Sequence, residues 1–368
     1  MTNKTDTLLS SYPGLFAHAG GSGVLLGMLG VLELNLNGLP FPGWSTQETR
    51  RAVADALLAE LRKMRRRRWT YCAQLSELSA EERYLLLERG QLTAPMAARQ
   101  DGVYVLTDAE QMSLCLINDE EHLLVQTFYP GAGGNRAEQV VEDMQRLRDA
   151  LAAKLPVAHD PAFGFLAGDP SKCGEALYIS YLVHLPGLRL AKHLQQSINA
   201  LEDMNIYTSS LFPCCKDEPG DLCLVHSPAT PQHKLRETLE RMQSTLADLA
   251  HQELNARARL MQGAKTAPRI KRAVAEALHM LSTAKQLSYR DTIESLSLIR
   301  FGMHTGILST PHPGVAELLS RAYVDTAPAH LRRREGLKTQ RSSRSARAAY
   351  IRRLVAEQLC ITLPTQAE

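Results

Sequence analysis

The sequence predicts an α+β fold in which a mainly antiparallel sheet flanked by helices is followed by an all-helical region. Between residues 102 and 128, apolar runs of period two alternate with short polar loops, a pattern typical of an antiparallel meander. Segments of helical period separate this meander from further strand-like runs. Beyond about residue 260 every apolar segment has helical period, which indicates a separate C-terminal bundle.

The first half of the chain supplies the predicted sheet with most of its strands. The run VLLGMLGVLEL (24–34) is strand-like, and Ser45 with Glu48 has the spacing of a helix-initiating capping box. Asn135 is the expected N-cap of the helix after the meander. The remaining elements expected here are short helices over 75–97, strands over 102–107, 112–117 and 122–128, and a helix over 137–155.

The second half completes the sheet and then becomes helical. It predicts strands over 177–184, 206–212 and 221–226, and helices over 189–204, 232–250, 266–284, 289–307, 313–323 and 340–360. We therefore expect an N-terminal extension (1–23), an α+β domain (24–257) and a helical domain (258–368).

The composition is that of a soluble globular protein, with 44% hydrophobic and 22% charged residues. No signal-like N-terminus and no apolar run of about 18 residues occurs, so we expect a cytoplasmic protein without membrane attachment. The seven cysteines are odd in number and mostly isolated, which favours buried thiols over disulfides. Cys214, Cys215 and Cys223 lack a fourth ligand and C-x-x-C spacing, so no metal is expected.

The net charge is only +3, but the basic residues are clustered in two blocks, one over 62–68 and one over 332–353. Such blocks are usually solvated faces, and docking of an acidic partner or nucleic acid is the alternative. Apart from Trp69 and Tyr71, no aromatic residues are interleaved with them, so nucleic acid is a minor option.

Two glycine-rich stretches are weak candidates for phosphate loops. GGSGVLLG (20–27) has neither a strand before it nor a helix after it. PGAGGN (130–135) lies between a strand and a helix but lacks the Gly-Lys-Ser/Thr ending, so a plain connecting loop is favoured.

Two other segments have the character of a site. FLAGDPSKCGEALYIS (165–180) is a loop leading into a strand, and its residues alone allow a phosphate cradle, a Cys173 nucleophile or the remnant of a lost site. NDEEHLLVQ (118–126) places three carboxylates at the head of a strand, where they can accept a proton or hold a guanidinium. A polar turn is the alternative for the second segment.

Both segments resemble the phosphagen kinase superfamily, specifically bacterial protein-arginine kinases of the McsB type. The family reads Asn-Glu-Glu-Asp-His in the first segment and Phe-Gly-Tyr-Leu-Thr-Ser-Cys-Pro-Thr-Asn in the second. LNLNGLPFP (34–42) and LSLIRFGMHTGIL (296–308) are also similar to family motifs. The resemblance extends over about 24–355 and implies the glutamine-synthetase-like catalytic fold of phosphagen kinases, with a helical dimerisation domain.

The same resemblance implies that the phosphate-binding residues are degenerate. Family arginines that hold the ATP phosphates correspond here to Leu29, Val31, Leu124, Tyr178 and Thr208, with Ser209 as the alternative to the last. At about 1.5–3 kcal/mol per charge-assisted contact, losing five removes more than a typical nucleotide site provides. We therefore expect no cofactor; ATP and magnesium enter only if replacement cations, such as Lys172, sustain an active guanidino kinase.

Family positions on the guanidinium side are partly retained. Glu120 matches the catalytic carboxylate, and Asp169 stands at the position of the family cysteine. These acids predict a cation-attracting site for an unmodified arginine side chain. The phosphoarginine-sensing motif of the family corresponds to Ser343–Ala348, where Arg344 and Arg347 are the residues expected to line such a pocket.

The resemblance also suggests a role and partners. It predicts a regulatory or scaffolding pseudokinase in stress response or protein quality control. A zinc-containing activator protein and a Clp-type unfoldase are the implied partners, and a homodimer is the implied assembly.

Overall fold

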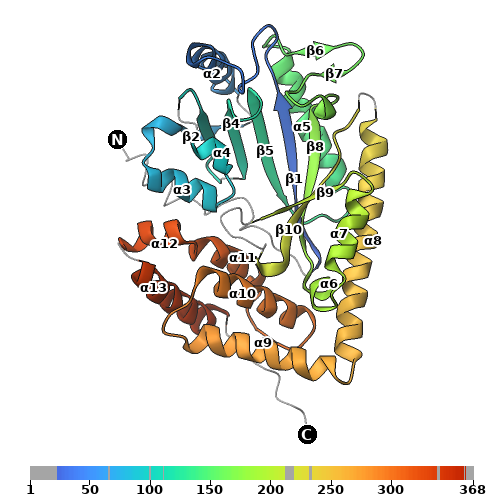
Figure 1. Ribbon diagram of the computed structural model, residues 1–368, viewed down its shortest axis with the longest axis vertical. Helices are drawn as coiled ribbons and strands as arrows, with labels where there is room; N and C mark the ends of the chain where they lie inside the picture. The colour runs from blue at the N-terminus through green and yellow to red at the C-terminus, as the bar shows by residue number, and fades with distance from the viewer. Residues whose placement is uncertain are drawn as a thin grey trace.

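An eight-stranded antiparallel sheet forms the centre of the molecule, with strand order β2-β3-β4-β5-β1-β8-β10-β9 (Figure 1). The computed structural model describes residues 23–64, 67–98, 101–110, 112–211, 219–231, 234–337, 340–359 and 361. The central strand β1 pairs with β5 on one side and β8 on the other. The strands are β1 (Leu25–Leu34), β2 (Trp69–Gln74), β3 (Tyr104–Asp108), β4 (Ser113–Ile117), β5 (Leu123–Pro130), β8 (Leu177–His184), β9 (Tyr207–Ser210) and β10 (Leu222–His226).

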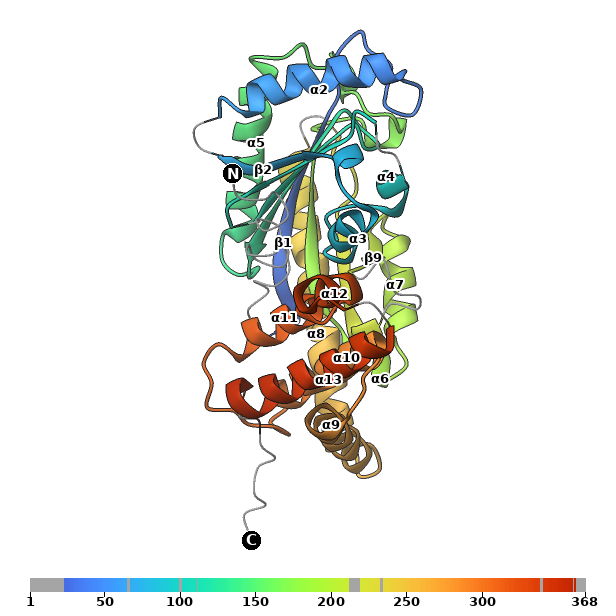
Figure 2. The ribbon, with the colours of Figure 1, turned by 90° about the vertical axis from the view of Figure 1, so that its left-hand side faces the viewer.

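Helices α2 (Gln47–Leu61), α5 (Arg136–Ala152) and α8 (Leu235–Gln262) pack on one face of the sheet, and α2 lies across its end (Figure 2). Val140 and Met242 pack there against Met28 and Tyr181 in one apolar cluster. A second cluster joins α2 to α5 over the strands. A two-stranded hairpin, β6 (His159–Asp160) with β7 (Gly164–Phe165), precedes the loop that leads into β8.

The opposite face packs against α3 (Ala80–Glu88), α4 (Ala94–Ala98) and the C-terminal helices. One continuous apolar cluster contains Leu29 and Val31 of the sheet together with Val274, Ile293 and other residues of the helical region. The two regions therefore share a core. The C-terminal helices are α9 (Thr266–Thr283), α10 (Tyr289–His304), α11 (Val315–Asp325), α12 (Pro328–Glu335) and α13 (Gln340–Arg353), followed by a π-helical turn (Leu354–Leu359).

The predicted fold class is confirmed, but several element boundaries differ, and β2, β6, β7 and α12 were not predicted. Thr46, not Ser45, is the N-cap of α2, because its hydroxyl accepts the Thr49 N–H at 3.2 Å. Asn135 is at the N-cap position of α5 but makes no side-chain capping bond. The expected helix over 189–204 is two helices, α6 (Pro186–Leu190) and α7 (Leu194–Glu202), because Lys192 between them has φ of 63°.

Two further differences lie at the domain boundary and in the helical region. The expected division at 257/258 falls inside α8, which continues to Gln262. Helix α12 was not predicted, although Pro328 at its start and the left-handed Gly336 at its end are recognised boundary signals. The expected extension, residues 1–23, lies outside the described residues except for Gly23.

A buried polar contact joins the sheet region to the helical region. The Glu88 carboxylate, at the end of α3, accepts the backbone N–H groups of Ala329 (2.7 and 2.9 Å) and His330 (3.3 Å) at the start of α12. Arg89 lies 3.3 Å from His330 Nδ1, and both side chains are buried. Burial raises the pKa of Glu88 to about 7 and lowers that of His330 to about 3.

The raised pKa of Glu88 predicts a pH-dependent effect of Glu88→Gln. A carboxyl whose folded-state pKa is raised stabilises the fold below its unfolded pKa, about 4.5, and loses that contribution as pH rises through about 7. Relative to wild type, Glu88→Gln should therefore gain about 2–3 kcal/mol of unfolding free energy between pH 5 and pH 8. Urea denaturation of both proteins at pH 5 and pH 8 measures this difference. His330 is present in both proteins, so its own titration cancels in the comparison.

The matched control is Glu81→Gln on the same helix, whose side chain is 42% exposed and lies 3.8 Å from Arg332. Its unfolding free energy relative to wild type should change by less than about 0.5 kcal/mol over the same pH range. Equal behaviour of the two variants would contradict the prediction.

In the part of the chain that the structure describes, no helix has both the length and the apolar character needed to cross a bilayer.

Candidate functional site

The acidic segment 118–122 forms the tight connection between β4 and β5. Asn118 adopts a left-handed conformation (φ 61°), and its amide donates to the backbone oxygens of Arg50 (2.8 Å) and Gly102 (2.7 Å). His122 accepts the Leu36 N–H at Nδ1 (3.0 Å), so its Nε2–H donates to Pro40 O (3.0 Å). Burial lowers the pKa of His122, which favours this neutral form. The segment is thus fixed at both ends, and the Glu120 side chain, 72% exposed, extends from it.

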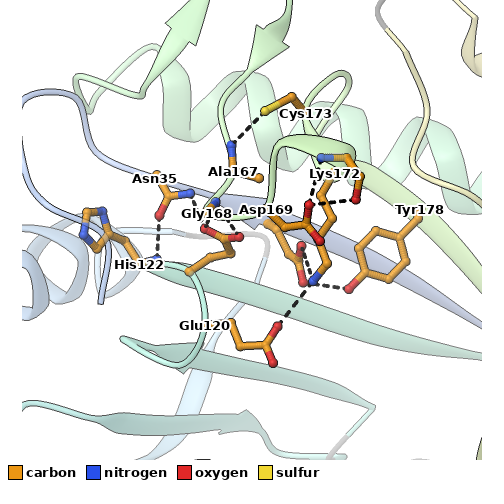
Figure 3. A network of polar contacts seen from close by, with 12 residues as sticks. Asn35, Glu120, His122, Ala167, Gly168, Asp169, Lys172, Cys173 and Tyr178 are labelled. Atoms are coloured by element: carbon orange, nitrogen blue, oxygen red, sulfur yellow. Dashed lines mark hydrogen bonds and ion pairs between the residues drawn. The ribbon is translucent and has the colours of Figure 1, made fainter. Parts of the chain in front are cut away.

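Glu121 attaches the loop 165–174 to the end of β1. Its carboxylate accepts the Gly168 N–H at 2.9 and 3.0 Å and the Asn35 amide at 2.5 Å (Figure 3). Asn35 in turn accepts the His122 N–H at 2.9 Å. Burial raises the pKa of Glu121, and the hydrogen bonds from Asn35 and Gly168 oppose that rise. Glu121 is therefore a structural carboxylate, whereas the neighbouring Glu120 is open to solvent.

Asp169 and Cys173 shape the loop. Asp169 is exposed, and its carboxylate accepts the Ser171 N–H (2.9 Å) and hydroxyl (2.8 Å), which caps the short helical turn Pro170–Lys172. These hydrogen bonds hold the pKa of Asp169 below its usual range. The Cys173 sulfur accepts the Ala167 N–H at 3.4 Å. Neither side chain contacts Glu120 in the observed bonds, so a direct role for Asp169 stays a prediction.

Lys172 extends from this loop into a site formed by two carboxylates. Its Nζ lies 3.3 Å from Glu120 Oε2 and 3.7 Å from Glu33 Oε2. The Tyr178 hydroxyl donates to Glu33 Oε1 at 2.7 Å from the other side. Figure 3 shows Lys172 pointing between Glu120 and Tyr178. The result is an ammonium group held by one exposed and one buried carboxylate.

The electrostatics of this group follow from its burial. Burial raises the pKa of Glu33, whose side chain is 8% exposed, and the Lys172 ammonium opposes that rise. Burial alone would lower the pKa of Lys172, but the Glu33 and Glu120 carboxylates outweigh it and keep that pKa above its ordinary value. Burial and the Glu33 charge raise the pKa of Tyr178 well above its ordinary value. Tyr178 is therefore a hydrogen-bond donor that orients Glu33.

The positions predicted to have lost phosphate-binding arginines lie mostly together on one sheet face. Directly opposed residues on neighbouring strands share a face, and Val31 pairs with Tyr178 while Glu33 pairs with Leu124. Leu29 is two residues from Val31 on the same strand and therefore faces the same way. Leu29 is 7% exposed and Val31 is 1% exposed, both in the cluster shared with the C-terminal helices. This face is apolar where Leu29 and Val31 stand and acidic at Glu33.

Thr208 does not belong to this group. It pairs with Val225, which pairs with Tyr181, and these residues face α5 and α8. Ser209 is on the same face as Tyr178, and its hydroxyl lies 2.7 Å from His226 Nε2. Ser180 lies 2.7 Å from His226 Nδ1. Of the two alternatives only Ser209 can stand at a site on this face, because a one-residue shift along a strand reverses the side-chain direction.

Arg344 and Arg347, the residues expected to line a phosphoarginine pocket, differ in burial. Arg347 is 2% exposed and donates to the backbone oxygens of Thr326 (2.7 Å) and Leu287 (2.9 Å). Its guanidinium lies 5.6 Å from the centre of the Tyr289 ring. Arg344 is exposed on the same helix. Arg347 therefore ties α13 to the ends of two neighbouring segments.

The first basic block also has an internal role. Arg67 is 14% exposed and donates to Thr127 (2.7 Å) and Asp143 (2.9 Å), while Lys63 pairs with Glu60 at 2.7 Å. Cys214 and Cys215, considered above as metal ligands, lie outside the described residues. Among the residues that the structure does describe, no three His, Cys, Asp or Glu side chains are grouped to hold a metal ion.

Glu33 is the site residue that the sequence analysis missed. The signal was present, because Glu33 is the one charged residue in the apolar run 24–34 and lies two residues from Val31. Period two places both side chains on one face of the strand. A carboxylate at an inward position of a central strand is a recognisable sign of a buried polar contact.

Comparisons of the sequence with known proteins match two family models and several protein-arginine kinases. Residues 52–256 match the family model of the ATP:guanido phosphotransferase C-terminal catalytic domain, and residues 267–361 match that of the protein-arginine kinase McsB C-terminal domain. A protein-arginine kinase of Halothermothrix orenii is 26% identical over 318 residues, covering 86% of this chain and 88% of that protein. One of Moorella thermoacetica is 27% identical over 340 residues, covering 88% of this chain and 92% of that protein.

Solved structures extend the likeness to the fold. The substrate-free duplicated taurocyamine kinase of Schistosoma mansoni superposes with a TM-score of 0.54 at 19% identity, covering 80% of this chain and 42% of that duplicated chain. A lombricine kinase superposes with a TM-score of 0.53 at 20% identity, covering 70% of this chain and 71% of that one. The two family models match most of the sheet region and then the helical region, so the chain belongs to the protein-arginine kinase family of ATP:guanido phosphotransferases.

Proposed function

We propose that this chain is a protein-arginine-kinase-like protein that does not transfer phosphate and acts instead as a regulatory or scaffolding partner. The observation that carries the proposal is the sheet face formed by Leu29, Val31, Glu33 and Leu124. Leu29 and Val31 are buried in the core, and Glu33 adds a carboxylate beside them.

Mg·ATP, which the family name implies, does not fit these residues. Phosphoryl transfer relies on positive groups positioned around the phosphates. Here the triphosphate would face Leu29 and Val31, with no donors in those side chains, and the negative charge of Glu33. Transferring charge to such a surface without partners costs several kcal/mol per group.

The alternative is an active guanidino kinase that uses replacement cations, and Lys172 is the cation in the polar network around Glu120. Its ammonium is engaged by Glu33 and Glu120, on the acidic side of the network. A phosphate bound to Lys172 would lie beside the negative charges of Glu33 and Glu120. Its ion pairs therefore favour the proposal over the alternative.

A phosphotransfer assay tests the proposal. Wild type and Glu120→Gln are incubated with labelled ATP and an arginine-rich protein, and acid-labile label is measured. The proposal predicts the same background label for both proteins. Acid-labile label that depends on Glu120 would overturn it and establish the kinase.

The retained function that we propose is recognition of an unmodified arginine side chain. Glu33 and Glu120 form a cation-attracting pair, and a guanidinium is the cation that carboxylates hold best through two parallel hydrogen bonds. By extension from the family, we also propose a cytoplasmic role in stress response or protein quality control. A zinc-containing activator protein, a Clp-type unfoldase and a second copy of this chain are the proposed partners.

A further inference from the structure

We propose that Lys172 is an internal competitor for the arginine side chain, so that its ammonium keeps the acidic site closed to external cations. This inference rests on the proposed arginine recognition and concerns how the same site is controlled. Its basis is the position of Lys172 Nζ, 3.3 Å from Glu120 Oε2 and 3.7 Å from Glu33 Oε2. A cation from outside would have to take the place of this ammonium.

The site that Lys172 fills has a fixed side and an open side. Glu33 is 8% exposed and is held by the Tyr178 hydroxyl at 2.7 Å, so its carboxylate has a defined position. Glu120 is 72% exposed, and Lys172 itself is 35% exposed. On this proposal a ligand approaches from the exposed Glu120 side and takes the place of the Lys172 ammonium beside Glu33.

To free the two carboxylates, only the Lys172 side chain has to move. The loop backbone can stay in place, where it is held at several points. Phe165 and Gly174 exchange two backbone hydrogen bonds (2.8 and 3.1 Å) that close the loop at its base. Gly168 N–H donates to Glu121, and Asp169 caps the turn that carries Lys172. Rotation of a partly exposed lysine side chain releases the two carboxylates without breaking any of these bonds.

The exchange is chemically favourable for a guanidinium. Lysine presents a compact and strongly hydrated ammonium, whereas arginine presents a planar fork that pairs with a carboxylate through two parallel hydrogen bonds. The ion pair between Lys172 and the exposed Glu120 is of a kind that contributes little free energy on its own. The internal ligand is thus weak enough to be displaced, and its advantage is that it is tethered beside the site.

The apparent affinity for an external arginine depends on how often the site is free. When the competent state has fraction f, the apparent dissociation constant is the intrinsic one divided by f. If Lys172 occupies the site about nine-tenths of the time, removing its charge tightens binding by about tenfold. This is the effect that distinguishes a competitor from a lysine that merely lies nearby.

The experiment is calorimetric titration of the full chain with N-acetyl-arginine amide, comparing wild type, Lys172→Met and Lys172→Arg. Lys172→Met keeps the length of the side chain but lacks the charge, and it should bind about tenfold more tightly than wild type. Lys172→Arg keeps an internal cation and should bind no more tightly than wild type. Adding Glu33→Gln to Lys172→Met should reverse the gain, and thermal unfolding confirms that each variant is folded.

A chemical readout accompanies the titration. Displacement exposes the Lys172 amine, so its acetylation by an N-hydroxysuccinimide ester, measured by peptide mass spectrometry, should become faster when the arginine amide is added to wild type. N-acetyl-glycine amide is the matched control ligand and should leave the rate unchanged.

The outcomes separate this inference from the proposed function. Equal affinity of wild type and Lys172→Met, with no change in Lys172 acetylation, would overturn the competitor role and leave arginine recognition standing. Absence of binding by both proteins at millimolar ligand would overturn arginine recognition and, with it, the competitor. Binding that is tighter than wild type for Lys172→Met, but not for Lys172→Arg, supports both arginine recognition and the competitor role.

Discussion

Val31→Arg is expected to lower the free energy of unfolding by about 3–5 kcal/mol, because it forces a larger side chain and a charge into a closely packed position that is shut off from solvent. The change restores an arginine at a family phosphate-binding position, yet Val31 is 1% exposed in the cluster that joins the sheet to the C-terminal helices. The new guanidinium would displace apolar contacts without gaining a phosphate partner. Urea denaturation measures the loss, and calorimetry with Mg·ATP should show no gain in nucleotide binding.

Leu124→Arg is the matched control for this prediction. Leu124 is only half-buried and pairs across the strands with Glu33, so an arginine there has both solvent access and a carboxylate on its face. Its cost should stay below about 1 kcal/mol. A Val31→Arg protein as stable as wild type would show that this face is open, contrary to our description.

Glu253→Ala is expected to cost about 3–5 kcal/mol, because it leaves a buried arginine without a counter-ion. Glu253 is fully buried, and Arg257 Nε donates to it at 2.6 Å. The same carboxylate accepts the N–H groups of Gly187 (2.8 Å) and Leu188 (2.7 Å) at the start of α6. The substitution therefore removes the acceptor for a charge and two backbone donors at once, and chemical denaturation measures the result.

The double variant Glu253→Leu with Arg257→Met separates the charge effect from the loss of packing. Replacing both members of a buried ion pair by apolar side chains often costs far less than removing one member. We expect the double variant to be more stable than Glu253→Ala. If it were equally unstable, the loss would come from the α6 backbone donors or from packing, and not from the unpaired Arg257.

Secondary structure was predictable wherever a strong period coincided with burial. The strand 24–34, the meander and the helices over 137–155 and 266–284 follow their apolar patterns because one face of each packs on a core, whereas α8, expected over 232–250, continues to Gln262. Local backbone conformation was harder to predict. The helix break at Lys192 depends on a positive φ, which a lysine in the sequence does not indicate. The shift of the α2 N-cap to Thr46 depends on which hydroxyl reaches the Thr49 amide.

The candidate site was predictable in its location and less so in its contacts. The sequence placed Glu120 and the loop 165–174 side by side through the family resemblance, and the structure brings Lys172 of that loop to Glu120. Glu33 was missed although it is the one charged residue of its strand and lies two residues from Val31; that it bonds Tyr178, 145 residues away, is known only from the fold. Sequence alone also did not resolve Thr208 from Ser209, since only the strand register decides which side chain faces Tyr178.

The central claim is that the sheet face carrying Leu29, Val31 and Glu33 does not hold a nucleotide. The most direct measurement is calorimetric titration of the full chain with Mg·ATP, with the same titration of an authentic protein-arginine kinase as the positive control. Our account predicts no binding heat for this chain at nucleotide concentrations up to about 1 mM, the level of very weak sites. Saturable binding tighter than about 1 mM would contradict it.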